Sequence, residues 1–387
     1  MTLPALLGGP QAFSDPLPFA RPAAPPLDKV FARLAPSYDA GTLTTGPLVR
    51  ELEESVANRL GVDHVVAVAN CTSGLMLGIH ALAPKGPVLL PSFTFSASAH
   101  AISWNGIDTR FAECDRATFQ LDLEDASTRT EGIGAIMATH VFGAPCSPLE
   151  TERLAARANV PLIFDAAHGF GATHDGRAIG TFGDVEVFSM SPTKPLVAGE
   201  GGLVATNRAE IAEEVRLGRD YGNPGNYNTR FVGLNARLSE LHAAVALCSL
   251  DAIDEHLEKR RSLANRYIAN LSDVPGIATQ AVDPFDTHTW KDFTISVNPS
   301  TFGINRDALV RALRADGIDT RNYFDPPVHK QHSHNHPPVD LPITDEVSSR
   351  VVSLPLYRDL NDNVIDRISN VIVSMHEHAD QLTDSLS

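Results

Sequence analysis

The feature that most constrains the fold is an alternation, between residues 64 and 207, of short apolar runs with helix-like stretches. The apolar runs are HVVAVAN, PVLLP, IGAIMATHVFG, VPLIFDAA, DVEVFSM and GGLVATN. Helix-like segments such as SGLMLGIHAL and PLETERLAARA lie between the first four of them. Continuous apolar strands separated by helices are typical of βαβ units, in which helices cover both faces of a parallel sheet. The pattern therefore predicts an α/β fold with a mainly parallel, buried sheet.

Chain length and local pattern together predict three parts. A chain of 387 residues suggests two domains, or one large domain with an appendage. Residues 1–35 are rich in proline and alanine, and we expect an extended arm that lies on the body or on a partner subunit. Residues 36–255 are expected to form the large domain, with a long helical pattern from about 236 to 271 that bridges to the next part. Residues 256–387 alternate strand and helix on a smaller scale and predict a small C-terminal α/β domain.

The charge balance excludes several classes of partner. Lysine and arginine number 31 and aspartate and glutamate 47, which gives a net charge of −16. Such a chain would repel nucleic acids and anionic membranes, although a local basic pocket for one phosphorylated molecule stays compatible with it. The N-terminus lacks the pattern of a signal peptide and no stretch predicts a membrane span, so we expect a soluble, cytoplasmic protein without nucleic-acid or membrane partners.

Two charged residues lie where an α/β sheet can place them in one cleft. Asp165 ends the run VPLIFD, and the carboxyl ends of parallel strands face the crevice in which such sheets bind ligands. A turn or helix-capping role for Asp165 is the alternative. Lys194 is flanked by uncharged residues from Phe188 to Gly199, so burial can lower the pKa of its amine and make it a nucleophile. The nearby GFG does not meet the G-x-G-x-x-G spacing, which argues against a nicotinamide cofactor.

Two further segments fit a planar, phosphorylated ligand. The turn from Asn70 to Gly74 follows a strand and precedes a helix, where free backbone N–H groups favour a phosphate; capping of that helix by Thr72 or Ser73 is the alternative. Phe95 is either a core residue or a flat surface on which a ring stacks. A phosphate turn, an aromatic platform, a strand-end carboxylate and a secluded lysine together fit pyridoxal 5'-phosphate.

The ordered set of motifs resembles the DegT/DnrJ/StrS-type sugar aminotransferases, a branch of the aspartate aminotransferase fold (fold type I). The motifs extend over nearly the whole chain, from LTTGP at 43–47 to VSLPL at 352–356. Between them lie NCTSGL at 70–75, PSFTFSASAHAI at 91–102, FDAAHGFGA at 164–172, FSMSPTKPLVAGEGG at 188–202, RDYG at 219–222, GLNARLSELHAA at 233–244 and TRNYF at 320–324. The resemblance implies a three-layer sandwich around a mainly parallel seven-stranded sheet, with a smaller C-terminal α/β domain.

The resemblance also implies site residues. Lys194 is the catalytic lysine that forms a Schiff base with the cofactor, and Asp165 is the catalytic partner of its ring nitrogen. The remaining implied cofactor contacts are a stacking aromatic, a group near the 3-oxygen and the phosphate ligands, namely Phe95, His168, Thr72, Ser73, Ser189 and Asn235. Because the residue at the position of Asn235 reaches the neighbouring subunit's phosphate, the resemblance implies a homodimer with shared active sites. Tyr323 and His329 are the implied substrate contacts.

The implied reaction moves an amino group from L-glutamate, released as 2-oxoglutarate, to a nucleotide-linked keto sugar. The GEGG at 199–202 favours a 4-keto-6-deoxy sugar. Lys194 favours transamination, because a related dehydratase subgroup has histidine at that position. Met190-Ser191 and Cys71 depart from the family's usual residues.

A keto-cyclitol aminotransferase is the alternative enzyme. A non-catalytic sensor or regulator is the alternative class, against which Lys194, Asp165 and the lack of an appended DNA-binding segment argue.

Two sets of residues contain potential metal ligands, and the sequence favours metal binding for neither. The four cysteines, Cys71, Cys114, Cys146 and Cys248, contain no C-x-x-C pair, so we expect reduced thiols. In HKQHSHNHPP at 329–338, three histidines alternate (His332, His334 and His336), which is conceivable for zinc. No cysteine or glutamate joins them. The resemblance places this loop near the mouth of the substrate pocket, so we favour sugar or nucleotide contact and expect no metal.

Overall fold

The computed structural model describes residues 3–333 and 338–386, and within them a seven-stranded sheet forms the centre of the molecule. Its strand order is β1-β9-β8-β5-β4-β2-β3. Strand β9 pairs antiparallel with both neighbours, whereas the other neighbouring pairs are parallel. The strands are β1 (His64–Val68), β2 (Val88–Pro91), β3 (Thr109–Ala112), β4 (Ala135–Thr139), β5 (Leu162–Asp165), β8 (Val185–Ser189) and β9 (Gly202–Thr206). The predicted mainly parallel, seven-stranded sheet is confirmed.

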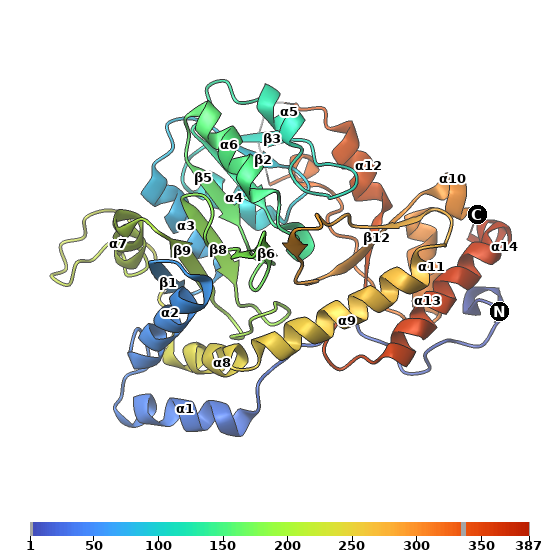
Figure 1. Ribbon diagram of the computed structural model, residues 1–387, viewed down its shortest axis with the longest axis horizontal. Helices are drawn as coiled ribbons and strands as arrows, with labels where there is room; N and C mark the ends of the chain where they lie inside the picture. The colour runs from blue at the N-terminus through green and yellow to red at the C-terminus, as the bar shows by residue number, and fades with distance from the viewer. Residues whose placement is uncertain (1–2, 334–337, 387) are drawn as a thin grey trace.

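Helices bury both faces of this sheet and so form three layers (Figure 1). On one face pack α3 (Cys71–Leu82), α4 (Ser96–Trp104) and α7 (Ala209–Gly218). On the other pack α2 (Pro47–Leu60), α6 (Pro148–Ala158) and α8 (Glu240–Leu250). Alternate residues of one strand point into opposite clusters, as Val66 and Ala67 of β1 do. The short helix α5 (Leu123–Thr128) and the 3-10 turn η2 (Val141–Gly143) complete this part.

The predicted single helix from about 236 to 271 is wrong, because the chain forms two helices. Helix α8 ends at Leu250 and α9 (Ile253–Leu271) begins after Asp251 and Ala252. Ser239 caps α8, with its side chain accepting a hydrogen bond from the backbone N–H of His242. Figure 1 shows α9 as a long diagonal helix that leaves α8 and runs alongside α13 (Asp362–Glu377). None of the helices within residues 3–333 and 338–386 has the length and apolar character needed to cross a lipid bilayer.

The C-terminal part has its own hydrophobic cluster, to which α9 contributes side chains from Leu263 onward. An antiparallel sheet of order β10-β12-β13 and the helices α11 and α13 surround it. The elements are β10 (Ile277–Thr279), β12 (Phe293–Val297), α10 (Pro299–Phe302), α11 (Arg306–Ala315), η3 (Val328–Lys330), α12 (Pro342–Arg350), β13 (Val351–Leu354), α13 (Asp362–Glu377) and α14 (Ala379–Leu386). A small sheet of β6 (Thr173–His174), β7 (Arg177–Ala178) and β11 (Asp286–Thr287) links the two parts. The domain boundary at 255/256 stays a prediction.

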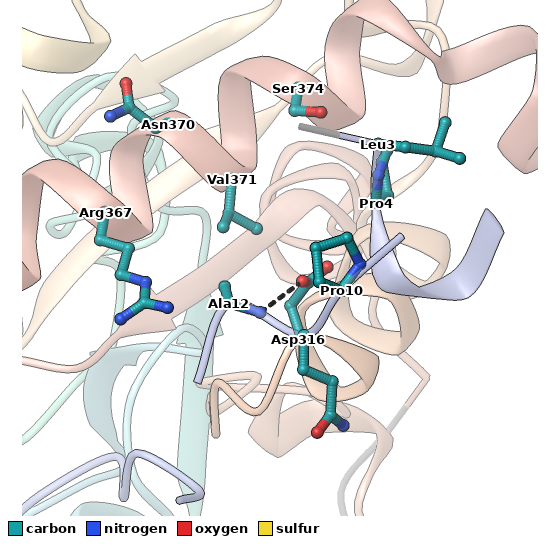
Figure 2. A pocket seen from close by; sticks show the side chains of 10 residues that line it. Leu3, Pro4, Pro10, Ala12, Asp316, Arg367, Asn370, Val371 and Ser374 are labelled. Atoms are coloured by element: carbon teal, nitrogen blue, oxygen red, sulfur yellow. Dashed lines mark hydrogen bonds between the residues drawn. The ribbon is translucent and has the colours of Figure 1, made fainter. Parts of the chain in front are cut away.

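The N-terminal segment lies on this C-terminal part. Asp316 accepts hydrogen bonds from the backbone N–H groups of Ala5, in the 3-10 turn η1 (Ala5–Leu7), and of Ala12. A cavity of about 500 Å³ lies beside these contacts, between the N-terminal segment and α13 (Figure 2). Helix α1 (Leu27–Asp39) packs against α8. The segment expected to be an extended arm is therefore helical from Leu27 onward.

Candidate active site

A cavity of about 300 Å³ lies at the carboxyl ends of β5 and β8, beside the start of α3. It gathers most of the predicted site residues, although they come from segments more than 200 residues apart in the sequence. The predicted residues that line it are Thr72, Phe95, Asp165, His168, Ser189, Lys194 and Tyr323. The cavity in Figure 2 is lined by other residues, from the N-terminal segment and the C-terminal part. The smaller cavity is therefore the candidate active site.

Asp165 is the last residue of β5 and is 4% exposed. The hydroxyl of Ser98, in α4, donates to its Oδ2 at 2.6 Å, and the backbone N–H of Ala167 donates to its Oδ1 at 3.1 Å. The bond from Ala167 is the local turn interaction that the alternative role of Asp165 predicts. Asp165 also lines the cavity. Its carboxylate is held there by both donors, Ser98 and Ala167, which together set its orientation.

Lys194 follows β8 in a turn in which its N–H donates to the carbonyl of Ser191 at 3.0 Å. Burial and, after it, the positive charge of Lys291 lower the pKa of Lys194 to about 8. The predicted lowering of this pKa is therefore present, with a second lysine contributing to it. An amine with this pKa has a substantial neutral fraction near pH 8, as a nucleophile and base requires.

His168 is held in one tautomer. The backbone N–H of Phe142 donates to its Nδ1 at 3.1 Å, so a neutral ring carries its proton on Nε2. Burial lowers the pKa of His168 well below its usual value, and the charges of Lys194 and Lys291 lower it further. The ring therefore stays neutral and offers an N–H donor at the cavity.

The start of α3 is capped by Asn70, and Ser73 takes part in this capping, as the alternative interpretation expected, whereas Thr72 does not. The Asn70 side chain accepts the N–H of Ser73 at 2.8 Å, and the Ser73 hydroxyl oxygen accepts the backbone N–H of Asn70 at 3.3 Å. This capping box turns Ser73 toward the helix, and the cavity is lined by Asn70, Cys71 and Thr72 instead. Ser189, at the end of β8, lines the same end of the cavity. A helix N-terminus with two nearby hydroxyls suits a phosphate.

Two aromatic residues lie at the cavity wall. Phe95 is 58% exposed, so the core alternative is wrong and a ring-stacking position remains. Its neighbour Phe324, whose ring centroid lies 6.5 Å from that of Phe95, also lines the cavity. For Tyr323, burial and then the negative charge of Asp292 raise the pKa to about 12, so its hydroxyl is protonated.

Besides Ser73, two predicted residues lie outside the lining of the cavity. Asn235 is exposed, pairs through its backbone with Asp220 and is outside the cavity of its own chain. The side chain of His329 is 4% exposed and lies against Ser92, whose hydroxyl oxygen accepts the backbone N–H of His329 at 2.9 Å and contacts its Nδ1 at 2.7 Å. The structure therefore does not bring His329 to the cavity.

The histidine-rich loop lies only partly within the described residues. His332 lies within the described residues, and His334 and His336 lie outside them. Across residues 3–333 and 338–386, no group of three or more histidine, cysteine, aspartate or glutamate side chains is arranged to hold a metal ion.

Sequence reasoning missed Lys291 and Asp292, which line the cavity, and Ser98, which lies outside it and donates to Asp165. Lys291 and Asp292 stand directly before the apolar strand β12 and after Trp290. Two charges between apolar residues are the same signal that singled out Lys194. Ser98 carries no such signal, because a serine in a helix is common and its partner is 67 residues away.

These residues fit pyridoxal phosphate. A buried carboxylate is held for a ring nitrogen, a lysine of lowered pKa shares its cavity, and a capped helix N-terminus with Thr72 and Ser189 stands at one end. Fold and site together define a pyridoxal-phosphate enzyme of fold type I.

Comparison with known proteins agrees with this class. The model of the DegT/DnrJ/EryC1/StrS aminotransferase family matches residues 28–373. A UDP-N-acetyl-3-dehydro-alpha-D-glucosamine 3-aminotransferase from Acidithiobacillus ferrooxidans is 31% identical over 354 residues, 90% of this chain and 94% of the relative. The crystal structure of DesI, determined in the presence of its TDP-sugar product, superposes with a TM-score of 0.92 at 36% identity and covers 98% of both chains. A family member from Brucella abortus has a TM-score of 0.83 at 30% identity, over 90% of this chain and 95% of its own.

The chain therefore belongs to the DegT/DnrJ/EryC1/StrS aminotransferase family. It is a pyridoxal-phosphate-dependent transaminase.

Proposed function

We propose that the protein transfers an amino group from L-glutamate to a nucleotide-linked keto sugar. The observation that carries the proposal is that Lys194 and the fixed carboxylate of Asp165 line one cavity beside the capped start of α3. The substrate class follows from the relatives, one named as an aminotransferase of a UDP-linked keto sugar and one solved with a TDP-sugar product.

Each cavity residue has a distinct task in this proposal. Thr72, Ser189 and the free N–H groups at the start of α3 would hold the phosphate of the cofactor, and Phe95 would lie against its ring. Asp165, oriented by Ser98, would keep the ring nitrogen protonated. The bound cofactor supplies an electron sink that makes the α-proton of the amino donor removable.

Lys194 would bind the cofactor and then move the proton. Its pKa of about 8 leaves part of the amine neutral at physiological pH, so it can accept the α-proton from the donor and return it at the carbon that receives the amine. His168 would donate its Nε2–H to the cofactor, because its Nδ1 is occupied by the Phe142 N–H.

The position of amination stays a prediction. GEGG at 199–202 favours C4, whereas the relative from Acidithiobacillus is named as a 3-aminotransferase. The test is a panel of 4-keto and 3-keto nucleotide sugars and one keto-inositol, with glutamate as donor and mass spectrometry of the products. Amination of a 4-keto nucleotide sugar supports the proposal. Amination of the keto-inositol alone, or turnover of none of them, contradicts it.

We further propose a homodimer with composite active sites, in which Asn235 of one chain reaches the cofactor phosphate of the other. Asn235 is exposed and outside its own chain's cavity, and Ser239 rather than Asn235 caps α8. Mixing Asn235→Ala with Lys194→Ala chains yields heterodimers with one intact site, so activity should return on mixing. A monomer by light scattering, or demonstrated heterodimers without activity, would refute the shared site.

A further inference from the structure

A second buried lysine shares the active-site cavity and has no task in the mechanism above. Lys291 and Asp292 both line this cavity, with side chains only 5% and 2% exposed. The ammonium of Lys291 donates to both carboxylate oxygens of Asp292, at 2.8 and 2.9 Å. The backbone carbonyl of Lys291 is fixed in turn by the guanidinium of Arg260, a buried residue of α9, at 3.1 Å. The pair is therefore a rigid part of the cavity wall.

The ammonium of Lys291 keeps one donor for a ligand. A lysine has three N–H donors, and two of them are bound to Asp292. For the third, the described residues 3–333 and 338–386 provide no hydrogen-bond acceptor, and the ring of Tyr323 lies 5.6 Å from Nζ. The charge of Lys291 also lowers the pKa of Lys194, so it acts across the cavity on the reacting amine. An anionic group bound here would stand close to the reacting carbon.

The proposed reaction poses a charge problem that this pair can solve. The amino donor brings a carboxylate one bond from the reacting carbon, whereas the ring of a keto sugar is uncharged there. A lone buried ammonium would suit the donor but would be left unpaired, at considerable cost, when the sugar is bound. An ammonium that is already paired with a neighbouring carboxylate can donate its third N–H to the carboxylate of the amino donor. When that donor leaves, the ammonium is still paired and no unpaired charge is left buried.

We propose, on the basis of the proposed function, that Lys291 binds the carboxylate of the amino donor and that Asp292 neutralises Lys291 when the uncharged sugar ring occupies the same space. Lys291 then determines specificity for the anionic donor. The phosphates of the nucleotide are the other source of negative charge. They are separated from the keto carbon by the sugar ring, so we assign Lys291 to the carboxylate and make phosphate binding an outcome of the test.

The test measures equilibrium binding to the cofactor-loaded enzyme by calorimetry, with glutarate as an unreactive carboxylate probe and thymidine diphosphate as the phosphate probe. Lys291→Met should raise the Kd for glutarate at least tenfold and change that for thymidine diphosphate less than twofold. Asp292→Asn removes the competing carboxylate, so it should bind glutarate at least as tightly as the unaltered protein. Lys85→Met is the matched control, because Lys85 is exposed and lies in the turn before β2, at the opposite end of the sheet from the cavity.

Several results would overturn the assignment. Unchanged glutarate binding in Lys291→Met, or equal losses for both probes, would make the pair structural. A loss confined to thymidine diphosphate would assign the ammonium to a phosphate. Should Lys291→Met not fold, the double variant Lys291→Met/Asp292→Asn removes both charges and must still lose glutarate at least tenfold. These outcomes do not depend on the sugar panel, so a failure of the proposed keto-sugar substrate is recognised separately.

Discussion

The proton affinity of Lys194 is the property of the site that can be tested most directly. In the folded chain without cofactor, the pKa of this amine is lowered from 10.5 to about 8. Burial is the largest cause and the charge of Lys291 is the next, while Asp292, Cys71 and Asp165 act in the opposite direction. Because burial disfavours the ammonium form, the sign is fixed: the neutral amine appears as the pH rises through about 8.

The size of the effect follows from these two values. At pH 7 an amine with a pKa of about 8 is roughly 9% neutral, whereas one with a pKa of 10.5 is about 0.03% neutral. The folded protein therefore presents about 300 times more of the reactive form than an unperturbed lysine would.

The assay is competitive acetylation of the protein freed of cofactor, between pH 6 and pH 11, with the extent at Lys194 read by mass spectrometry of its peptide. The same chain in denaturant is the reference, because unfolding removes both burial and the neighbouring charge. We expect a midpoint near 8 in the folded chain and one near 10.5 in the reference. Two midpoints within half a pH unit of each other would refute the reasoning.

Three further predictions concern residues whose contacts are fixed by the structure. Asp165→Asn should bind cofactor but turn over about a hundredfold more slowly, since a neutral partner no longer holds a positive ring nitrogen; near-normal kcat would make the carboxylate structural. Ser98→Ala removes the 2.6 Å bond to Asp165 and should lower kcat by a smaller factor, about tenfold, with cofactor affinity nearly unchanged in a titration. Glu240, fully buried, accepts the N–H groups at the start of α2, so Glu240→Gln should cost about 2–4 kcal/mol in urea unfolding, with the exposed Glu210→Gln as control.

Most of the sheet could be predicted because its strands are continuous apolar runs. Strand β3 was not among those runs, since it lies at the sheet edge and its first residues, Thr109 and Arg110, are only half-buried. The break between α8 and α9 could not be predicted either. Asp251 keeps helical backbone angles, and no glycine or proline marks the interruption at Asp251 and Ala252.

The candidate site divides in the same way. Asp165 ends β5 and Lys194 lies in the turn that follows β8, the neighbouring parallel strand, so the geometry of the sheet brings them to the same edge. Lys291 and Asp292 line the same cavity but come from the C-terminal part. No local sequence pattern predicts how this part packs against the central sheet. Their position depends on how α9 and β12 pack, and on the bond from Arg260 that fixes the loop between them.

One pair of variants connects the proton affinity of Lys194 with donor binding, because both depend on Lys291. Lys291→Met removes a positive charge that acts on Lys194, so the pKa of Lys194 should rise while glutarate binding weakens. Asp292→Asn removes a negative charge that raises this pKa, so the pKa should fall while glutarate binding is kept or strengthened. A purely structural disturbance of the cavity would expose Lys194 to water in either variant and move its pKa upward in both. Opposite shifts of the acetylation midpoint in the two variants are therefore expected, and shifts in the same direction would contradict an electrostatic role for the pair.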